Sequence, residues 1–411
     1  MTGRVILVAL DWIRPKDPRS TLGHASILAR LRAEPGIEVV PMSCAVNAPT
    51  FDRGAVLVAI LAALCAGTAI AIGVYVWNEP VVQWLLPALR QAGFTGRIVL
   101  GGPQITYASS GVLDLYPDAD LAIRGAGEDA LSSLLRGDDP ARITGVVARG
   151  STDVVTQAIA DFSRLPSPIL SLTLPVTPFV RWETHRGCVY RCNFCQHRAP
   201  ANRRPQFLAQ DRIGHEIDAL VAGGATDVAV LDPIFHTNPN ALLVLDRFAS
   251  RGFRGRLSLQ CRFEQVDEAF LEACANLTVR LEFGLQTSQP AEMRAIGRMN
   301  HLPKIERVID QLRKRQIQFE VSLIYGLPEQ TLASFRETVA WCLDRGVPTL
   351  RAFPLMLLRG TGLDHDRARW SLVEDDAVIP VVVESSTFTR ADWTEMHMLA
   401  ESLDAHVAVD L

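Results

Sequence analysis

Lysine is scarce in this chain, which has only three among its 411 residues: Lys16, Lys304 and Lys314. Chemistry that needs a buried Schiff-base lysine, including most pyridoxal phosphate chemistry, therefore has few carriers here. An excess of either charge is also lacking, because 41 basic residues stand against 45 acidic ones and the net charge is −4. Such a balance gives no general electrostatic surface for nucleic acid or an anionic membrane. We therefore expect neither as a partner.

Disulfide-forming cysteine is also in short supply, since eight unevenly spaced cysteines are too few for a secreted disulfide scaffold of this length. The opening segment, MTGRVILVAL, is too short and too weakly flanked for a signal peptide. Hydrophobic residues make up 48% of the chain and charged residues 21%, a composition that can bury an ordinary core. We predict a globular protein of the reducing cytoplasm.

One uncharged run, residues 55–77, is long enough to span a bilayer. Gly67 and Thr68 divide it into a helical first half and a β-branched second half, as is typical of a helix that leads into a buried parallel strand. No lysine or arginine cluster flanks either side. We favour the globular alternative and expect no membrane segment.

The N-terminal half alternates apolar strand candidates with helical stretches. The strand candidates are residues 5–10, 38–42, 69–77, 97–100 and 121–124. This alternation predicts an α/β fold with a doubly wound, Rossmann-like parallel sheet, in which ligands bind at the carboxyl ends of the strands. The candidate binding residues at those ends are Trp77, Asn78, Gly101, Gly102, Pro103, Gln104, Gly125 and Gly127. Their glycines either let the backbone approach a bulky ligand or simply form tight turns.

The strongest motif is ETHRGCVYRCNFCQHR, in which Cys188, Cys192 and Cys195 follow an apolar strand at 179–183. A zinc site with His185 or His197 as the fourth ligand is one interpretation. The other is a 4Fe-4S cluster, because three thiolates would leave one iron open to a substrate or cosubstrate.

Further strand candidates follow this loop at residues 227–232, 256–262, 279–286, 319–326 and 349–357. Helix-length segments separate them, which predicts a partial (β/α)6 barrel of the TIM type. We predict a first domain over residues 1–140, a linker over 141–178, the barrel over 179–358 and a short C-terminal cap over 359–411.

This cysteine spacing, on the loop after the first barrel strand, resembles the signature of the radical S-adenosylmethionine superfamily. The resemblance implies that S-adenosylmethionine binds the open iron and is cleaved to a 5′-deoxyadenosyl radical, with electrons from an external reductant such as flavodoxin or ferredoxin. It also implies that Phe194 packs near the adenine. The other implied contacts are Asp232 to the amino group, Glu282 and Gln286 to the ribose, Arg298 to the methionyl carboxylate and the Gly326 backbone to the adenine.

The order of the two halves, with VYVWN and LGGPQITY before the barrel, resembles the cobalamin-binding class of these enzymes. The Asp-x-His-x-x-Gly motif that supplies a lower cobalt ligand is absent, and we expect the first domain's one histidine, His24, to be an ordinary surface residue. The resemblance implies a cobalamin-dependent methyltransferase acting on an unactivated carbon of a small metabolite. Two alternatives stay open: a radical enzyme with non-methylating chemistry and a vestigial or differently used cobalamin domain, and a non-catalytic iron-sulfur redox or sensing protein.

Overall fold

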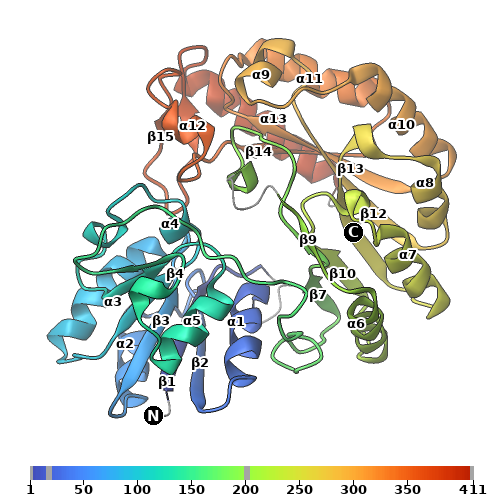
Figure 1. Ribbon diagram of the computed structural model, residues 1–411. Coiled ribbons are helices and arrows are strands. Elements are labelled where there is room, and N and C mark those ends of the chain that lie inside the picture. The colour runs from blue at the N-terminus through green and yellow to red at the C-terminus, as the bar shows by residue number, and fades with distance from the viewer. Residues whose placement is uncertain (1–2, 15–20, 199–203, 408–411) are drawn as a thin grey trace. The chain divides into compact units, whose positions relative to one another are not determined.

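The computed structural model describes residues 3–14, 21–198 and 204–407. The chain divides into two compact units, Met1–Thr177 and Pro178–Leu411 (Figure 1). Each unit is built around its own six-stranded sheet.

The sheet of the first unit has the order β2-β1-β3-β4-β5-β6. Its strands are β1 (Gly3–Asp11), β2 (Ile37–Ala45), β3 (Thr68–Gly73), β4 (Ile98–Gly101), β5 (Leu121–Ile123) and β6 (Val146–Ala148). The pairs that join β1 to β5 are parallel, whereas β6 runs antiparallel to β5. The carboxyl ends of five strands therefore meet at one edge of this sheet.

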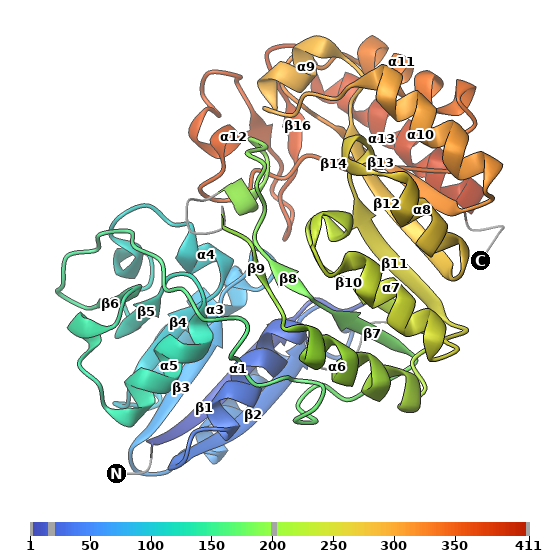
Figure 2. The ribbon, with the colours of Figure 1, turned by 45° about the vertical axis from the view of Figure 1, so that its right-hand side comes forward.

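Helices cover both faces of this sheet (Figure 2). They are α1 (Leu22–Arg32), α2 (Arg53–Ala62), α3 (Glu79–Gln91), α4 (Pro103–Thr106) and α5 (Gly127–Arg136), with 3-10 turns at Val112–Asp114 and Pro140–Arg142. Alternate residues of β1 point to opposite sides: Ile6 joins a core with α2 and α3, whereas Leu7 joins a second core with α1 and α5. The predicted doubly wound α/β arrangement is confirmed.

The apolar run at 55–77 forms α2 apart from its first two residues, then a turn, β3 and the four residues after β3. Nowhere in the described ranges does a helix combine the length and the apolar character that a membrane crossing requires. The strand that we predicted to reach Trp77 ends at Gly73, because the Asn78 side chain accepts a hydrogen bond from the Tyr75 N–H at 2.8 Å and folds the chain into a turn.

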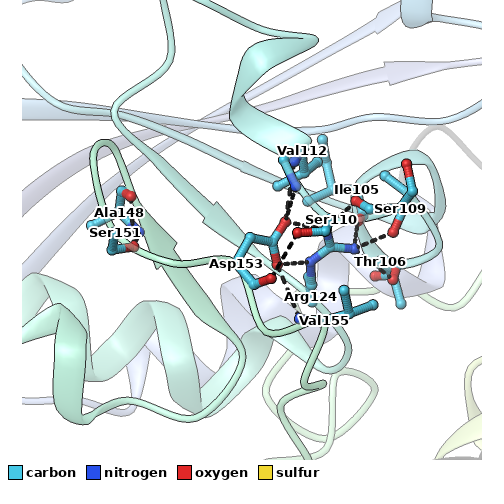
Figure 3. Close-up of polar contacts among 12 residues, drawn as sticks. Ile105, Thr106, Ser109, Ser110, Val112, Arg124, Ala148, Ser151, Asp153 and Val155 are labelled. Atoms are coloured by element: carbon cyan, nitrogen blue, oxygen red, sulfur yellow. Dashed lines mark hydrogen bonds and ion pairs between the residues drawn. The ribbon is translucent and has the colours of Figure 1, made fainter.

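The segment for which we predicted a linker, residues 141–178, supplies β6, and all of it except its last residue belongs to the first unit. A fully buried ion pair attaches it to the sheet: Arg124, directly after β5, binds Asp153 with side-chain exposures of 0% and 4% (Figure 3). The remaining donors of Arg124 reach the carbonyls of Ile105, Thr106, Ala108 and Ser109, and Asp153 accepts the N–H groups of Gly111, Val112 and Val155. This pair therefore fixes the loop that follows β4 and α4.

The second unit has the strand order β14-β13-β12-β11-β10-β7, with every pair parallel. The strands are β7 (Phe179–Trp182), β10 (Asp227–Val230), β11 (Arg256–Cys261), β12 (Thr278–Gln286), β13 (Gln318–Tyr325) and β14 (Thr349–Pro354). Helices α6 (Gln210–Ala222), α7 (Ala241–Ser250), α8 (Glu268–Ala275), α10 (Leu302–Lys314) and α11 (Leu332–Asp344) alternate with them on one face (Figure 2). The predicted partial (β/α)6 barrel is confirmed.

Smaller elements complete this unit. They are the pair β8 (His185–Arg186) and β9 (Gln206–Phe207), the 3-10 turns at Gln196–Arg198, Phe235–Thr237 and Phe263–Gln265, α9 (Pro290–Ala295), α12 (Gly362–His365), the pair β15 (Val373–Glu374) and β16 (Val382–Glu384), and α13 (Arg390–Val407). Helix α13 packs against β14, and the hydroxyl of Tyr325 lies 2.8 Å from Nδ1 of His397. The segment after the last strand thus closes one side of the barrel.

Replacing Asp153 by alanine should lower the free energy of unfolding by about 3–5 kcal/mol, because it leaves the buried Arg124 guanidinium unpaired. Urea denaturation followed by circular dichroism measures this change. The matched control is Asp138→Ala, which breaks an ion pair whose side chains are 40% and 49% exposed and should cost no more than about 1 kcal/mol. Equal losses in the two variants would contradict the role given to Arg124 and Asp153.

The same pair predicts a pH dependence. Burial alone raises the pKa of Asp153, but the hydrogen bonds from Arg124, Val112 and Val155 outweigh it and lower the pKa. A carboxyl of lowered pKa stabilises the fold above its unfolded pKa of about 4, and this stability is lost as the pH falls through the folded value. Stability should therefore drop more steeply below pH ~4 in the wild type than in Asp153→Asn.

Candidate functional site

The loop that carries the three cysteines begins at the carboxyl end of β7, and Asp232 anchors its start. Asp232 is 0% exposed, and its Oδ1 accepts hydrogen bonds from the N–H groups of Thr184 at 2.6 Å and His185 at 3.0 Å. Its Oδ2 accepts from the Thr184 hydroxyl and lies 3.1 Å from Nδ1 of His185. Because these contacts occupy both carboxylate oxygens, Asp232 positions the loop here instead of offering a free oxygen to an amino group.

Further along, the loop is fixed to the end of a helix and to the end of a strand. The N–H and the side-chain amide of Asn193 donate to the carbonyls of Ile296 and Ala295, at 2.7 and 2.9 Å. The guanidinium of Arg262, at the end of β11, lies 3.9 Å from the centre of the Tyr190 ring. The cysteine loop is therefore fixed to the carboxyl end of α9 and to the residue that follows β11.

The three cysteines of this loop are free thiols, with Cys192 buried and Cys188 and Cys195 half-buried. Burial, with the neighbouring Cys192 and Cys188, raises the pKa of Cys195 to about 11 against the lowering effect of a hydrogen bond from the His197 backbone and of the Arg298 charge. Binding to a metal would therefore release protons from these thiols. Within the described ranges, no group of three His, Cys, Asp or Glu side chains is arranged so that it could hold a metal ion. We considered His185 and His197 as a fourth zinc ligand, and the His185 ring lies against Asp232.

Arg298 connects the cysteines to the barrel interior. One terminal nitrogen lies 3.9 Å from Sγ of Cys192 and the other donates to the carbonyl of Gly284. Its Nε is buried and has no hydrogen-bond partner among the described residues. An unsatisfied buried donor costs about 1–3 kcal/mol, and Arg298 also lines the cavity at the carboxyl ends of the barrel strands.

A cavity of about 380 Å³ opens at the carboxyl ends of the barrel strands. Its lining includes four of the predicted residues: Phe194, Glu282, Gln286 and Arg298. Gln286 has a φ of 69° at the point where the register between β12 and β13 shifts. This uncommon conformation in a non-glycine residue marks a locally strained strand end within the cavity wall.

Gly326 follows β13 and is not among the residues that line this cavity. Its φ is 86°, and its N–H donates to the side-chain oxygen of Gln330 at 2.7 Å. The Gln330 amide also donates to the buried carboxylate of Glu292 at 3.2 Å. The turn after β13 is therefore held by a polar network, and its N–H group is already used.

The cavity also has an apolar wall that we did not predict. It consists of Ile324 on β13, with Phe353, Pro354, Leu355, Met356 and Leu358 on and after β14. Phe353 and Met356 are 46% and 37% exposed. The position of these residues at a predicted carboxyl end was the signal that could have identified them.

In the first unit, several predicted binding residues have contacts within the protein. The Asn78 amide is 0% exposed and donates to the carbonyls of Leu10 at 2.8 Å and Gly73 at 3.0 Å, so it joins the ends of β1 and β3. The Trp77 indole also donates to Leu10, at 3.1 Å, and the Gln104 amide donates to Glu79. Pro103 occupies the first turn of α4.

The four glycines at this edge fall into two groups. A Cβ at Gly102 would lie 2.6 Å from the Val74 oxygen, and one at Gly125 would lie 2.3 Å from the Ala158 oxygen. Both also have positive φ, so protein packing explains them. A Cβ at Gly101 or Gly127 would meet no described atom nearer than 3.9 or 3.7 Å, and packing therefore does not require glycine at these two positions.

Comparison with known proteins places the barrel in a family. Residues 182–342 match the model of the radical SAM superfamily, so this part of the chain is a radical SAM domain. The predicted recognition of that superfamily is confirmed.

Two curated relatives extend the similarity toward the first unit. The cobalamin-dependent radical SAM methyltransferase TokK of Streptomyces tokunonensis is 24% identical over 72% of this chain and 48% of its own length. A 2-(S-pantetheinyl)-carbapenam-3-carboxylate methyltransferase of Streptantibioticus cattleyicolor is 24% identical over 79% of this chain and 55% of its own length. The chain thus spans about half the length of these relatives.

A solved structure aligns with nearly the whole chain. It is that of the radical S-adenosylmethionine methyltransferase TsrM from Kitasatospora setae, with cobalamin and a 4Fe-4S cluster bound. The alignment covers 96% of this chain and 81% of TsrM, with a TM-score of 0.72 and 18% identity. The two proteins therefore share a fold through both units.

Asp232→Asn should lower the iron bound after anaerobic reconstitution by about tenfold or more, because the NH2 group in place of Oδ2 cannot accept the Thr184 hydroxyl and the neutral amide oxygen accepts the two N–H groups more weakly than a carboxylate. Iron and sulfide analysis with the visible spectrum measures this loss. The matched control, Asp246→Asn, changes an exposed residue of α7 and should bind iron like the wild type. If Asp232→Asn bound as much iron as the wild type, Asp232 would not be the anchor of the cysteine loop.

Proposed function

We propose that this protein is a cobalamin-dependent radical S-adenosylmethionine enzyme that methylates an unactivated carbon of a small metabolite. The observation that carries the proposal is the three-cysteine loop of the radical SAM domain, which lies beside a cavity with an unsatisfied buried arginine donor. The fold shared with TsrM through both units supports the cobalamin part. When bound, the 4Fe-4S cluster supplies the electron that cleaves S-adenosylmethionine, and the cobalamin carries the methyl group.

The residues of the barrel suit the cluster and S-adenosylmethionine. Cys188, Cys192 and Cys195 supply three thiolates, which leaves one iron for the amino and carboxylate groups of the cosubstrate. The free Nε–H of Arg298 is available to the methionyl carboxylate. The carboxylate of Glu282 suits the ribose hydroxyl groups as a hydrogen-bond acceptor.

The remaining two side chains complete the cosubstrate site in this proposal. The amide of Gln286 lines the same wall as Glu282 and can donate or accept. The ring of Phe194 stands at the cysteine end of the cavity, where it offers a flat apolar surface to the adenine.

The first unit offers a site for the corrinoid at the carboxyl ends of β4 and β5. Gly101 and Gly127 leave room that packing does not use, so a flat macrocycle could approach the backbone there. His24 does not supply a cobalt ligand in this proposal: its side chain is buried in α1, contrary to our expectation of a surface residue, and burial lowers its pKa to about 4. Cobalamin would be held without a histidine ligand.

The remaining parts of the proposal concern partners and compartment. The substrate is a small molecule, and the electron comes from an external one-electron carrier such as flavodoxin or ferredoxin. Free thiols throughout the chain suit a reducing compartment, and we place the enzyme in the cytoplasm.

The decisive experiment is anaerobic incubation of the reconstituted protein with S-adenosylmethionine, reductant and cobalamin, followed by mass spectrometry of the nucleosides. We expect both 5′-deoxyadenosine and S-adenosylhomocysteine. Deoxyadenosine alone would indicate non-methylating radical chemistry. Absence of both, with the cluster intact, would indicate a redox or sensing protein and contradict the proposal.

Arg298→Gln should weaken binding of S-adenosylmethionine by about ten- to a hundredfold, because a charged hydrogen bond to the carboxylate is lost. Isothermal titration calorimetry on the reconstituted protein measures the affinity. Arg294→Gln, an exposed arginine of α9, is the control and should bind normally. Equal affinity in the two variants would exclude Arg298 from the cosubstrate site.

Gly101→Leu should abolish retention of cobalamin during gel filtration while the fold survives, because the new side chain fills the room beside β4. The visible spectrum of the eluted protein measures bound corrinoid, and circular dichroism checks the fold. Ala92→Leu, at the exposed end of α3, is the control. Full retention of cobalamin by Gly101→Leu would place the corrinoid elsewhere.

A further inference from the structure

Three charged side chains lie one step below the cavity on the inner face of the barrel. The cavity is lined by Glu282, Ser322 and Phe353, on β12, β13 and β14 respectively. Alternate residues of a strand share a face, so Arg280, Glu320 and Arg351, each two positions earlier, face the same interior. We call Arg280, Glu320 and Arg351 the floor triad.

The floor triad is held together by charge alone. Oε2 of Glu320 lies 3.5 Å from Nε of Arg280 and 3.7 Å from Nε of Arg351. Oε2 of Glu320 and Nε of Arg351 are buried without a hydrogen-bond partner among the described residues. The Glu320 side chain is 8% exposed, whereas those of Arg280 and Arg351 are 17% and 30% exposed and so reach open space.

Stability does not account for this arrangement. Replacing a buried ion triad by apolar side chains is often neutral or stabilising, and unsatisfied buried polar atoms add a cost. Barrel interiors are usually filled by branched apolar residues. The contrast with Arg124 and Asp153 is direct, because that buried pair satisfies its donors and acceptors within the first unit.

The chemistry of the floor triad points to an anionic ligand group. Two guanidinium groups share one carboxylate, so the triad carries a net charge of +1 by simple count. A guanidinium presents donors in a planar fork that matches the two oxygens of a carboxylate or phosphate. Arg351 on β14 is the register partner of Ser322 on β13, and Ser322 lines the cavity, so the guanidinium of Arg351 extends from a position beside the cavity wall.

We propose that Arg351 and Arg280 anchor an anionic group of the substrate, a carboxylate or a phosphate, at the floor of the barrel. Glu320 holds the two guanidiniums in place and competes with the ligand for them. As a statement about the substrate, this inference rests on the proposed function. The triad would then determine specificity by selecting metabolites with a negatively charged end.

The test uses small ions on the full-length protein, with thermal unfolding as the measurement. Acetate, inorganic phosphate and methylammonium are titrated separately against sodium chloride at equal ionic strength. We expect acetate or phosphate to raise the melting temperature saturably, and the ion that does so identifies a carboxylate or a phosphate as the anchored group. Arg351→Gln should raise the half-saturating concentration about tenfold, and Arg351→Lys should raise it less.

Two further variants separate binding from folding. Glu320→Gln removes the competing carboxylate and should lower the half-saturating concentration of the anion, a result that a purely structural triad would not give. Arg336→Gln, an exposed arginine on α11 that pairs with Glu395, is the control and should respond like the wild type. Arg280→Gln replaces Arg351→Gln if the latter does not fold.

The proposal is overturned if no anion gives a saturable effect, if Arg351→Gln and Arg280→Gln respond like the wild type, or if methylammonium is the ion that binds. Reductive cleavage of S-adenosylmethionine, measured on the same samples without substrate, tests the proposed function separately. Cleavage without anion binding would refute the anchor alone. Anion binding without cleavage would refute the proposed radical chemistry and leave the anion site.

Discussion

Parallel pairing of strands is the constraint on which the rest of this structure depends. In each unit, the crossover helices return the chain to the same end of the sheet, so successive strands leave their carboxyl ends at one edge. The cysteine loop after β7, the cavity wall on β12 and β13, and the glycines after β4 and β5 all lie at such edges. Residues that are far apart in the sequence are thereby brought together at one edge of each sheet.

Buried charge is used in two different ways in the two units. Arg124 and Asp153 are fully desolvated, and their hydrogen bonds join the end of β5 to two segments without regular secondary structure, the loop after α4 and the segment around Asp153. The floor triad has ion pairs without hydrogen bonds and two unsatisfied atoms. In a low dielectric a satisfied network rigidifies, whereas an unsatisfied one costs free energy that a ligand can recover. We therefore distinguish a structural ion pair from a candidate ligand site by whether its polar atoms have hydrogen-bond partners within the protein.

Positioning of the cysteines falls to residues that do not face the cavity. Asp232 holds the start of the loop through Thr184 and His185, and Asn193 ties its middle to the backbone after α9. A loop of this kind has little regular structure, so side-chain hydrogen bonds replace the ladder that would hold a strand or helix. The positions of the three cysteines therefore depend on Asp232 and Asn193, which are not themselves candidate cluster ligands.

The sequence by itself determined the two α/β architectures, the one loop with three cysteines, and four residues of the cavity wall, because these depend on local periodicity and on spacing along the chain. It could not determine which polar side chains were already engaged. Asp232 and Asn78 read as binding residues at strand ends, and only the tertiary structure shows their oxygens and amide occupied by neighbouring strands.

The tertiary structure alone also shows that packing requires glycine at positions 102 and 125 but not at positions 101 and 127. The atoms that a Cβ would meet at these positions come from segments distant in the sequence. The same holds for the floor triad. Arg280, Glu320 and Arg351 are separated by at least 31 residues along the chain, and register between three parallel strands is what brings them together. Whether a buried polar group has a hydrogen-bond partner depends on its neighbours in space, whereas a sequence pattern shows only its neighbours along the chain.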